Sequence, residues 1–204
     1  VATVLVSHRA ERNVQEKARR ILLDQVVCVE GIRSTGDLIT AIDFINPDIP
    51  ERKPNTAKKT VYAALLSDLH VGSKKFQSKS FNKFLRWLTG REGNSRQREA
   101  ASRVKYVLIA GDLVDGIGIY PDQERELAIT DIYEQYELAA KIVQQIPEYV
   151  EVIIIPGNHD ATRQALPQPA ISREYAEPVY EAREVSMLGN PAKIRLNRVE
   201  FLLY

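Results

Sequence analysis

Three apolar segments of strand length, separated by helical patterns, constrain the fold of this chain more than any other feature. They cover residues 61–67, 104–110 and 150–155. Nearly continuous apolar runs of this kind are typical of strands buried on both faces of a parallel sheet. Helices are expected between them, at about residues 78–88 and 129–146. The alternation of strands and helices indicates right-handed crossovers, and it predicts an α/β fold with a parallel sheet.

Each of these three segments ends in side chains that can bind metal ions. Asp68 and His70 follow the first segment, Asp112 follows the second, and Asn158 and His159 follow the third. In an open α/β sheet the carboxyl ends of parallel strands line one crevice, so groups that are distant in the sequence meet there. We therefore expect these five side chains to converge.

Each cluster also has an ordinary structural explanation when it is taken alone. Asp112 follows a glycine and would suit a turn, while Asp68 would suit a helix cap beside a surface histidine. Asn158 would suit a left-handed turn, a conformation that asparagine accepts readily. A lone histidine such as His159 is usually a hydrogen-bonded structural residue. The occurrence of all these residues together, each at a strand terminus, favours a shared functional site.

Phosphodiester hydrolysis requires residues of these types. A phosphodiester is anionic and resists attack by water, and two divalent cations about 3.5–4 Å apart can neutralise its charge and supply hydroxide near neutral pH. Such cations bind carboxylate, imidazole and amide oxygen. Gly111 and Gly157 are expected to allow the tight backbone that turns the next side chain into the crevice. The single cysteine, Cys28, excludes an internal disulfide and a cysteine-built metal cage, and its apolar neighbours predict a small buried side chain.

Residues 1–46 have a different pattern, with short strands around one helix. This segment is too small to close a core alone, and it predicts the C-terminal part of an oligonucleotide-binding (OB) fold β-barrel. We expect strands at residues 1–6, 26–29 and 38–44, a helix at 14–23, and a turn bracketed by Gly31 and Gly36.

A linker is expected at residues 47–59, where three prolines and alternating charges interrupt any regular element. The second domain then covers residues 60–204. The chain starts at a valine and stops within an apolar run at residues 199–204 that is typical of a strand. We therefore expect it to be part of a longer protein.

The composition restricts the partners and the location of the chain. With 28 basic and 27 acidic residues the formal net charge is +1, so only local basic patches could attract nucleic acid. No apolar run approaches the roughly 18 residues of a membrane span, and no secretory signal is present in the sequence. We expect no membrane partner, and nothing in the sequence places the chain outside the cytoplasm.

The three strand-end segments resemble the first three motifs of the calcineurin-like metallophosphoesterases. The matching residues are Asp68-x-His70, Gly111-Asp112-x-x-Asp115 and Gly157-Asn158-His159-Asp160. The resemblance implies that residues 60–204 form the N-terminal half of a metallophosphoesterase domain, an αββα-type sandwich that is incomplete at its C-terminus.

The same resemblance implies a role for each site residue. Asp68 and His70 would bind the first metal ion, Asp112 would bridge both ions, and Asn158 would bind the second. His159 would not be a ligand; it would face the substrate, stabilise the phosphoryl oxygens and assist the leaving group. The remaining ligands of the family are histidines of later motifs, which this sequence lacks. Its only other histidine, His8, is expected on the surface of the first domain.

Longer stretches resemble the small subunits of archaeal family D DNA polymerases. These stretches are residues 67–73, 119–124 with 131–136, and 156–170. The resemblance implies a 3′-to-5′ proofreading exonuclease that acts on the primer 3′ end of single-stranded DNA, beside a large polymerising subunit and other replication proteins. By similarity the two divalent ions would be Mn²⁺, although the ligand set alone would also accept iron, zinc or magnesium.

Several alternatives remain open at the level of sequence. The chain could be a non-catalytic scaffold subunit, or a metallophosphoesterase that acts on another phosphodiester. Lys74 and Lys75 could bind a DNA phosphate, but exposed loop lysines are more often solvated. Phe84 and Trp87 fit helix core better than platforms for base stacking. Asp115 and Asp160 fit either a role in orienting ligands or a turn or cap.

Overall fold

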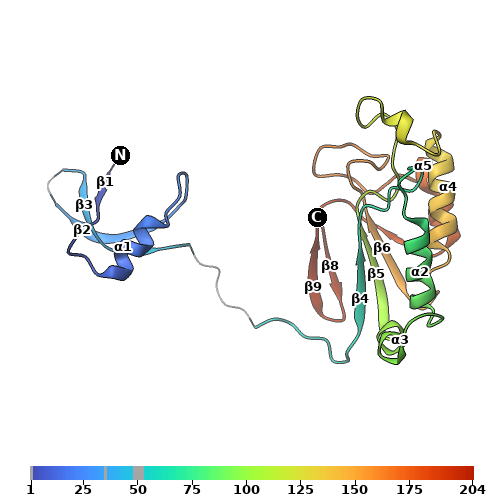
Figure 1. Ribbon diagram of the computed structural model, residues 1–204, viewed down its shortest axis with the longest axis horizontal. Coiled ribbons are helices and arrows are strands. Elements are labelled where there is room, and N and C mark those ends of the chain that lie inside the picture. The colour runs from blue at the N-terminus through green and yellow to red at the C-terminus, as the bar shows by residue number, and fades with distance from the viewer. Residues whose placement is uncertain (1, 35, 48–52) are drawn as a thin grey trace. The chain divides into compact units, whose positions relative to one another are not determined.

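The computed structural model describes residues 2–34, 36–47 and 53–204 and divides the chain into two compact units, Val1–Lys53 and Pro54–Tyr204 (Figure 1). The boundary falls within the segment expected as a linker. Residues 48–52 of that segment lie outside the described residues, as does Val1 of the first expected strand.

The first unit is a three-stranded sheet covered by one helix. The strands are β1 (Thr3–Leu5), β2 (Cys28–Arg33) and β3 (Leu38–Ile45), and the helix α1 spans Arg12–Arg19. The central strand β3 pairs parallel with β1 and antiparallel with β2. Val14 of α1 packs against Ala41 and Phe44 of β3 in a small core.

Three details of the first unit differ from the sequence-based expectation. The helix ends at Arg19 and not near residue 23, and Leu22 and Leu23 are exposed and contribute nothing to the core that α1 covers. Gly31 lies inside β2, at a shift in the β2–β3 register, where any Cβ would overlap the Thr40 backbone. Cys28 is exposed and not buried, because alternation along β2 turns its neighbours Val27 and Val29 toward the core instead.

The second unit is built on a parallel sheet, so the predicted α/β class is confirmed. Its strands are β4 (Tyr62–Leu66), β5 (Val104–Ala110), β6 (Glu151–Ile155) and β7 (Ser186–Met187), in that spatial order and all parallel. The central strands β5 and β6 are buried on both faces. The edge strand β4 is not, contrary to expectation, since Leu65 is 66% exposed. A continuous apolar run does not reveal the position of a strand in its sheet.

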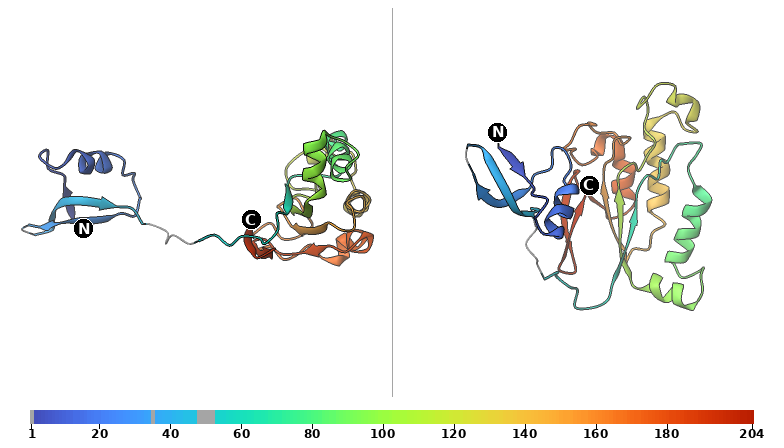
Figure 2. Two further views of the ribbon diagram at one scale, coloured as in Figure 1. Left: turned by 90° about the horizontal axis from the view of Figure 1, so that it is seen from below. Right: turned by 60° about the vertical axis from the view of Figure 1, so that its left-hand side comes forward.

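Helices cover one face of this sheet (Figures 1 and 2). They are α2 (Ser78–Leu88), α4 (Ile132–Val143) and α5 (Arg173–Ala182), and they share a core with the sheet residues Val107, Ile109 and Ile154. The expected helix at residues 78–88 is confirmed, and the one at 129–146 is shorter at both ends. The segment before β5 contains a further helix, α3 (Ser95–Ser102), which a capping box at Asn94 starts.

A β-hairpin lies on the opposite face of the parallel sheet (Figure 1). It consists of β8 (Ala192–Leu196) and β9 (Val199–Leu203), paired antiparallel. Leu196 and Leu203 of the hairpin pack against Leu108, Ile153 and Ile155 of β5 and β6 in a second core cluster. The second unit therefore has three layers, with helices, parallel sheet and hairpin in succession. None of the helices within the described ranges has the length and apolarity needed to cross a bilayer.

Candidate metal centre

The loops after β4 and β5 continue the parallel pairing of their strands. The Asp68 amide donates to the Gly111 carbonyl over 3.1 Å, and the His70 amide donates to the Asp112 carbonyl over 3.0 Å. Asp68, His70 and Asp112 all adopt left-handed backbone conformations, with φ of 54°, 49° and 52°. Such values are uncommon for residues other than glycine and are concentrated at functional sites. The backbone therefore fixes the side chains of the first two motifs in position relative to one another.

Two glycines bring the loop after β6 against the loop after β5. Gly111 has a φ of +89°, and a Cβ added to it would lie 3.1 Å from the Gly157 Cα. This agrees with the expected tight backbone at Gly111. At Gly157 the requirement is close approach, because a Cβ there would overlap the Asp112 carboxylate. The loop that carries the third motif therefore packs directly against the loop that carries the second motif.

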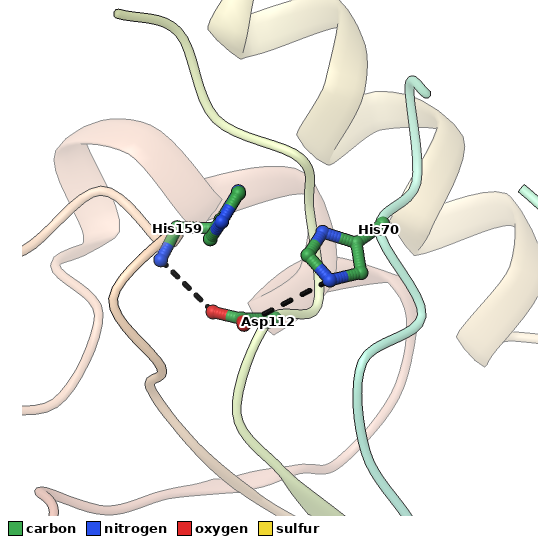
Figure 3. A group of neighbouring side chains, drawn as sticks. All are labelled: His70, Asp112 and His159. Atoms are coloured by element: carbon green, nitrogen blue, oxygen red, sulfur yellow. Dashed lines mark hydrogen bonds and ion pairs between the residues drawn. The ribbon is translucent and has the colours of Figure 1, made fainter. Parts of the chain in front are cut away.

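The structure brings His70, Asp112 and His159 into one group, drawn in Figure 3. One ligand atom from each lies within 4.8 Å of the other two. The His70 Nε2 atom is 3.8 Å from Asp68 Oδ1 and 3.8 Å from Asp112 Oδ2. These separations are too long for hydrogen bonds and leave room between the ligand atoms.

The residues fit a divalent cation. Two ligands on opposite sides of an ion with bonds of about 2.0–2.2 Å are about 4 Å apart, so small side-chain shifts would bring these atoms into a coordination shell. Imidazole nitrogen combined with carboxylate oxygen suits manganese, iron or zinc. The Asp68 carboxylate, 66% exposed, also faces His70. Asn158 is exposed and directly precedes His159 in the loop after β6.

Asp115 contacts both histidines. Its buried carboxylate lies 2.9 Å from the Nδ1 atom of His70, which leaves the Nε2 atom directed toward Asp68 and Asp112. A carboxylate beside the far nitrogen of a histidine fixes the tautomer and ring orientation that metal binding requires. Gln123 donates to the Asp115 carbonyl over 2.8 Å and so holds this residue in place. Of the two roles that the sequence leaves open for Asp115, the structure favours ligand orientation.

His159 is held by its backbone and by one ring nitrogen. Its amide donates to Asp112 Oδ1 over 2.9 Å, and its Nδ1 lies 2.7 Å from the Asp115 carbonyl oxygen. A carbonyl only accepts, so this contact assigns the proton to Nδ1 and leaves Nε2 without one in the neutral ring. The His70 and His159 rings meet edge to face at 4.6 Å.

Asp160 is a buried carboxylate that joins the second and third motifs. It accepts from the amides of Gly157 at 2.9 Å, Leu113 at 3.2 Å and Val114 at 3.3 Å. Burial raises its pKa to about 6, and the charge of Asp112 adds to this effect, while the amide donors oppose it. The fully buried Tyr136 hydroxyl donates to Asp160 over 3.4 Å and accepts from the Ala161 amide over 3.0 Å.

A cavity of about 490 Å³ opens beside the metal centre. Asp68, His70, Asp115 and His159 line it together with four aromatic side chains, two leucines and several polar residues, which include Lys75 and Glu126. Lys75, one of two lysines considered for phosphate binding, pairs with Glu126 across 2.6 Å and lowers the pKa of that carboxyl. Lys74 donates to the Arg125 carbonyl over 2.8 Å. Both lysines are thus engaged with the segment around the short helix η1 (Gln123–Glu126).

Residues 63–204 match the family model that describes the B subunit of DNA polymerase alpha/epsilon. The chain belongs to this family. The match covers the second unit from residue 63 onward, with all three motifs of the candidate metal centre.

Proteins similar to this chain include several archaeal DNA polymerase II small subunits. The protein of Pyrococcus furiosus is 45% identical over 190 residues, which are 92% of this chain and 31% of that protein. The protein of Methanothermobacter thermautotrophicus is 42% identical over 200 residues, 98% of this chain and 41% of that protein. The protein of Archaeoglobus fulgidus is 44% identical, over 93% of this chain and 38% of that protein. These matches confirm the resemblance to the small subunits of archaeal family D polymerases, and the chain spans less than half the length of each of these relatives.

Proposed function

We propose that the protein is the 3′-to-5′ exonuclease subunit of a replicative archaeal DNA polymerase and hydrolyses phosphodiester bonds in DNA with two divalent metal ions. The observation that carries the proposal is the meeting of His70, Asp112 and His159 at the carboxyl ends of three parallel strands. The family membership supports the choice of DNA as substrate, because the relatives are named as subunits of a DNA polymerase.

The proposed ligands are Asp68 and His70 for one ion, Asp112 as the bridge, and Asn158 for the other. When bound, the ions, Mn²⁺ by preference, would neutralise the phosphodiester charge and supply hydroxide near neutral pH. Asp115 holds the His70 ring so that its Nε2 stays free to bind.

His159 is proposed to act on the substrate. Its Nε2 is the ring nitrogen that the Asp115 carbonyl leaves free, and its ring lines the cavity. When protonated, this nitrogen can donate to a phosphoryl oxygen or to the departing 3′ oxygen. The contact at Nδ1 keeps the ring in the orientation for this role, in the manner of other histidines oriented by a second group.

The finer features of the fold belong to the same proposal. The hairpin β8–β9 opposite the helices is compatible with the second sheet of an αββα-type metallophosphoesterase sandwich. In the first unit, the parallel β1–β3 pair, the intervening helix and the antiparallel β2–β3 pair are compatible with the closing part of an OB-fold barrel. A large polymerase subunit is the proposed partner.

The test uses the purified full-length protein with Mn²⁺ and a primer that carries a mismatched 3′ end. We expect single nucleotides to be released from the 3′ end. The variant His159→Ala should retain its Mn²⁺, measured by calorimetry, and lose roughly 10²–10⁴-fold in rate, the usual contribution of a general acid. His8→Ala is the matched control, because His8 is exposed in the first unit, and it should behave as the wild type.

The rival functions give different results in this assay. A scaffold subunit would bind no Mn²⁺ and release no nucleotides. An enzyme for another phosphodiester would cleave a small diester but leave the primer intact. Full activity of His159→Ala would contradict the role proposed for His159.

A further inference from the structure

The cavity beside the metal centre has an apolar compartment that the hydrolysis of a phosphodiester does not require. Its wall consists of Leu66, Leu69, Phe76, Phe81 and Phe84. Of these, Phe81 is buried, whereas Phe76 and Phe84 are only half-buried and keep part of their rings accessible. Phe76 and Phe84 also pack against the main core, and the accessible parts of their rings offer an apolar surface that a phosphate and its cations would not use.

Aromatic side chains from two parts of the chain line the cavity. Phe84 lies 5.6 Å from Phe81 between ring centroids, and both rings come from the face of α2 that borders the cavity. At the metal end, the exposed Tyr120 ring lies 6.2 Å from the His159 ring. A flat group that entered here would meet ring surfaces while its phosphate stayed beside His70 and His159.

The cavity also has polar lining residues beyond the metal-binding groups, and Lys75 and Glu126 among them are paired with each other. Gln77 and Ser80 line it at the start of α2, and both are exposed. An amide and a hydroxyl each donate and accept hydrogen bonds, so they can pair with the edge of any nucleobase. The volume of about 490 Å³ is in the range of small-molecule pockets and is large enough for a single nucleobase.

We propose that this cavity binds the unpaired base of the 3′-terminal nucleotide, stacked against Phe76 and against the accessible part of Phe84, whose remaining surface packs against the core as expected. The proposal rests on the proposed nuclease function and predicts that this nuclease prefers unpaired 3′ ends. Stacking on aromatic rings tolerates every base, because each base has a π face. A mismatched end enters more readily than a paired one, since its base costs less to unpair.

The experiment compares two oligonucleotides that differ only at the 3′ end, where one carries a normal nucleotide and the other an abasic residue. Binding to the full-length protein is measured by fluorescence anisotropy in EDTA, without metal ions, and cleavage is measured with Mn²⁺. We expect the normal end to bind roughly 5- to 150-fold more tightly than the abasic end, the range expected for one stacked base.

Two variants test the cavity itself. Phe84→Ala removes a stacking surface, and Ser80→Trp fills the cavity from an exposed position that does not depend on the core. In both, the ratio of affinities between normal and abasic ends should fall toward one. Lys79→Trp is the matched control, because Lys79 is exposed on the same helix and does not line the cavity, and it should keep the wild-type ratio.

The outcomes separate this proposal from the nuclease function. If the wild type cleaves both oligonucleotides and binds them equally, the base-binding cavity is wrong and the nuclease function stands. If it cleaves neither, the nuclease function is wrong, and the affinities measured in EDTA still decide whether the cavity recognises a base. An unchanged affinity ratio in Ser80→Trp would also overturn the cavity.

Discussion

The substitution Asp115→Asn tests how the metal centre is organised, because it changes one atom type and keeps the shape of the side chain. In the wild type the buried Asp115 carboxylate lies 2.9 Å from His70 Nδ1, and its negative charge favours the proton on this nitrogen and leaves Nε2 free. An asparagine amide can instead donate to Nδ1. The proton would then move to Nε2, which could no longer bind a metal ion.

The expected loss follows from this contact. Removal of a carboxylate that orients a metal-binding histidine usually costs about 10–100-fold in metal affinity. We therefore expect Asp115→Asn to weaken Mn²⁺ binding by about 10- to 100-fold.

Isothermal titration of the metal-free full-length protein with MnCl₂ measures this effect. Asp122→Asn is the matched control, because Asp122 lies in the same loop, its side chain is 72% exposed, and it pairs with Arg125 at 3.4 Å. This control should bind Mn²⁺ as the wild type does. Wild-type affinity in Asp115→Asn, or an equal loss in both variants, would refute the argument that Asp115 orients His70.

Two further predictions concern the buried groups behind the centre. Tyr136→Phe leaves the Ala161 amide without its acceptor at 3.0 Å and should lower the free energy of unfolding, measured in urea, by about 1–3 kcal/mol. The control Tyr133→Phe, on the exposed face of the same helix, should change it by less than about 0.5 kcal/mol. Equal effects of the two substitutions would contradict the role of the Tyr136 hydroxyl as acceptor for the Ala161 amide. The pKa of Asp160 is raised to about 6, so the folded state keeps a proton that the unfolded state loses above about pH 4. Stability in EDTA should therefore fall by about 3 kcal/mol between pH 4 and pH 6, and Asp160→Asn should abolish this part of the decline; a wild-type profile in the variant would show that Asp160 is not its source.

The convergence of the motifs could be predicted from the sequence because it depends only on strand order and direction. Apolar runs and the intervening helical patterns were sufficient to place residues 68, 112 and 159 at one edge of a parallel sheet. The helix α2 and the strand β5 have the predicted bounds for the same reason, since both have a strong pattern of apolar residues.

Other features depend on contacts that no local pattern encodes. The helix α3 has a single buried residue, Ala101, so it lacks the apolar stripe by which a helix is recognised. The orientation of His159 depends on a backbone carbonyl, that of Asp115, which has no signature in the sequence. Gln123 is polar yet almost completely buried, because its side-chain amide donates to both the backbone carbonyl and the carboxylate of Asp115. In the sequence such a glutamine looks the same as one on an exposed loop.

The position of β4 at the edge of the parallel sheet has a consequence for how bound cations would be released. Among the described residues, β4 is hydrogen-bonded to a neighbouring strand on one side only, yet the loop that follows it carries Asp68 and His70. Strands with one neighbour detach at lower free energy than central strands. Cations bound by both His70 and Asp112 would hold β4 against β5. Detachment of β4 from the sheet would then be coupled to release of the cations. Protection of the β4 amides from hydrogen exchange would then rise with the concentration of the metal.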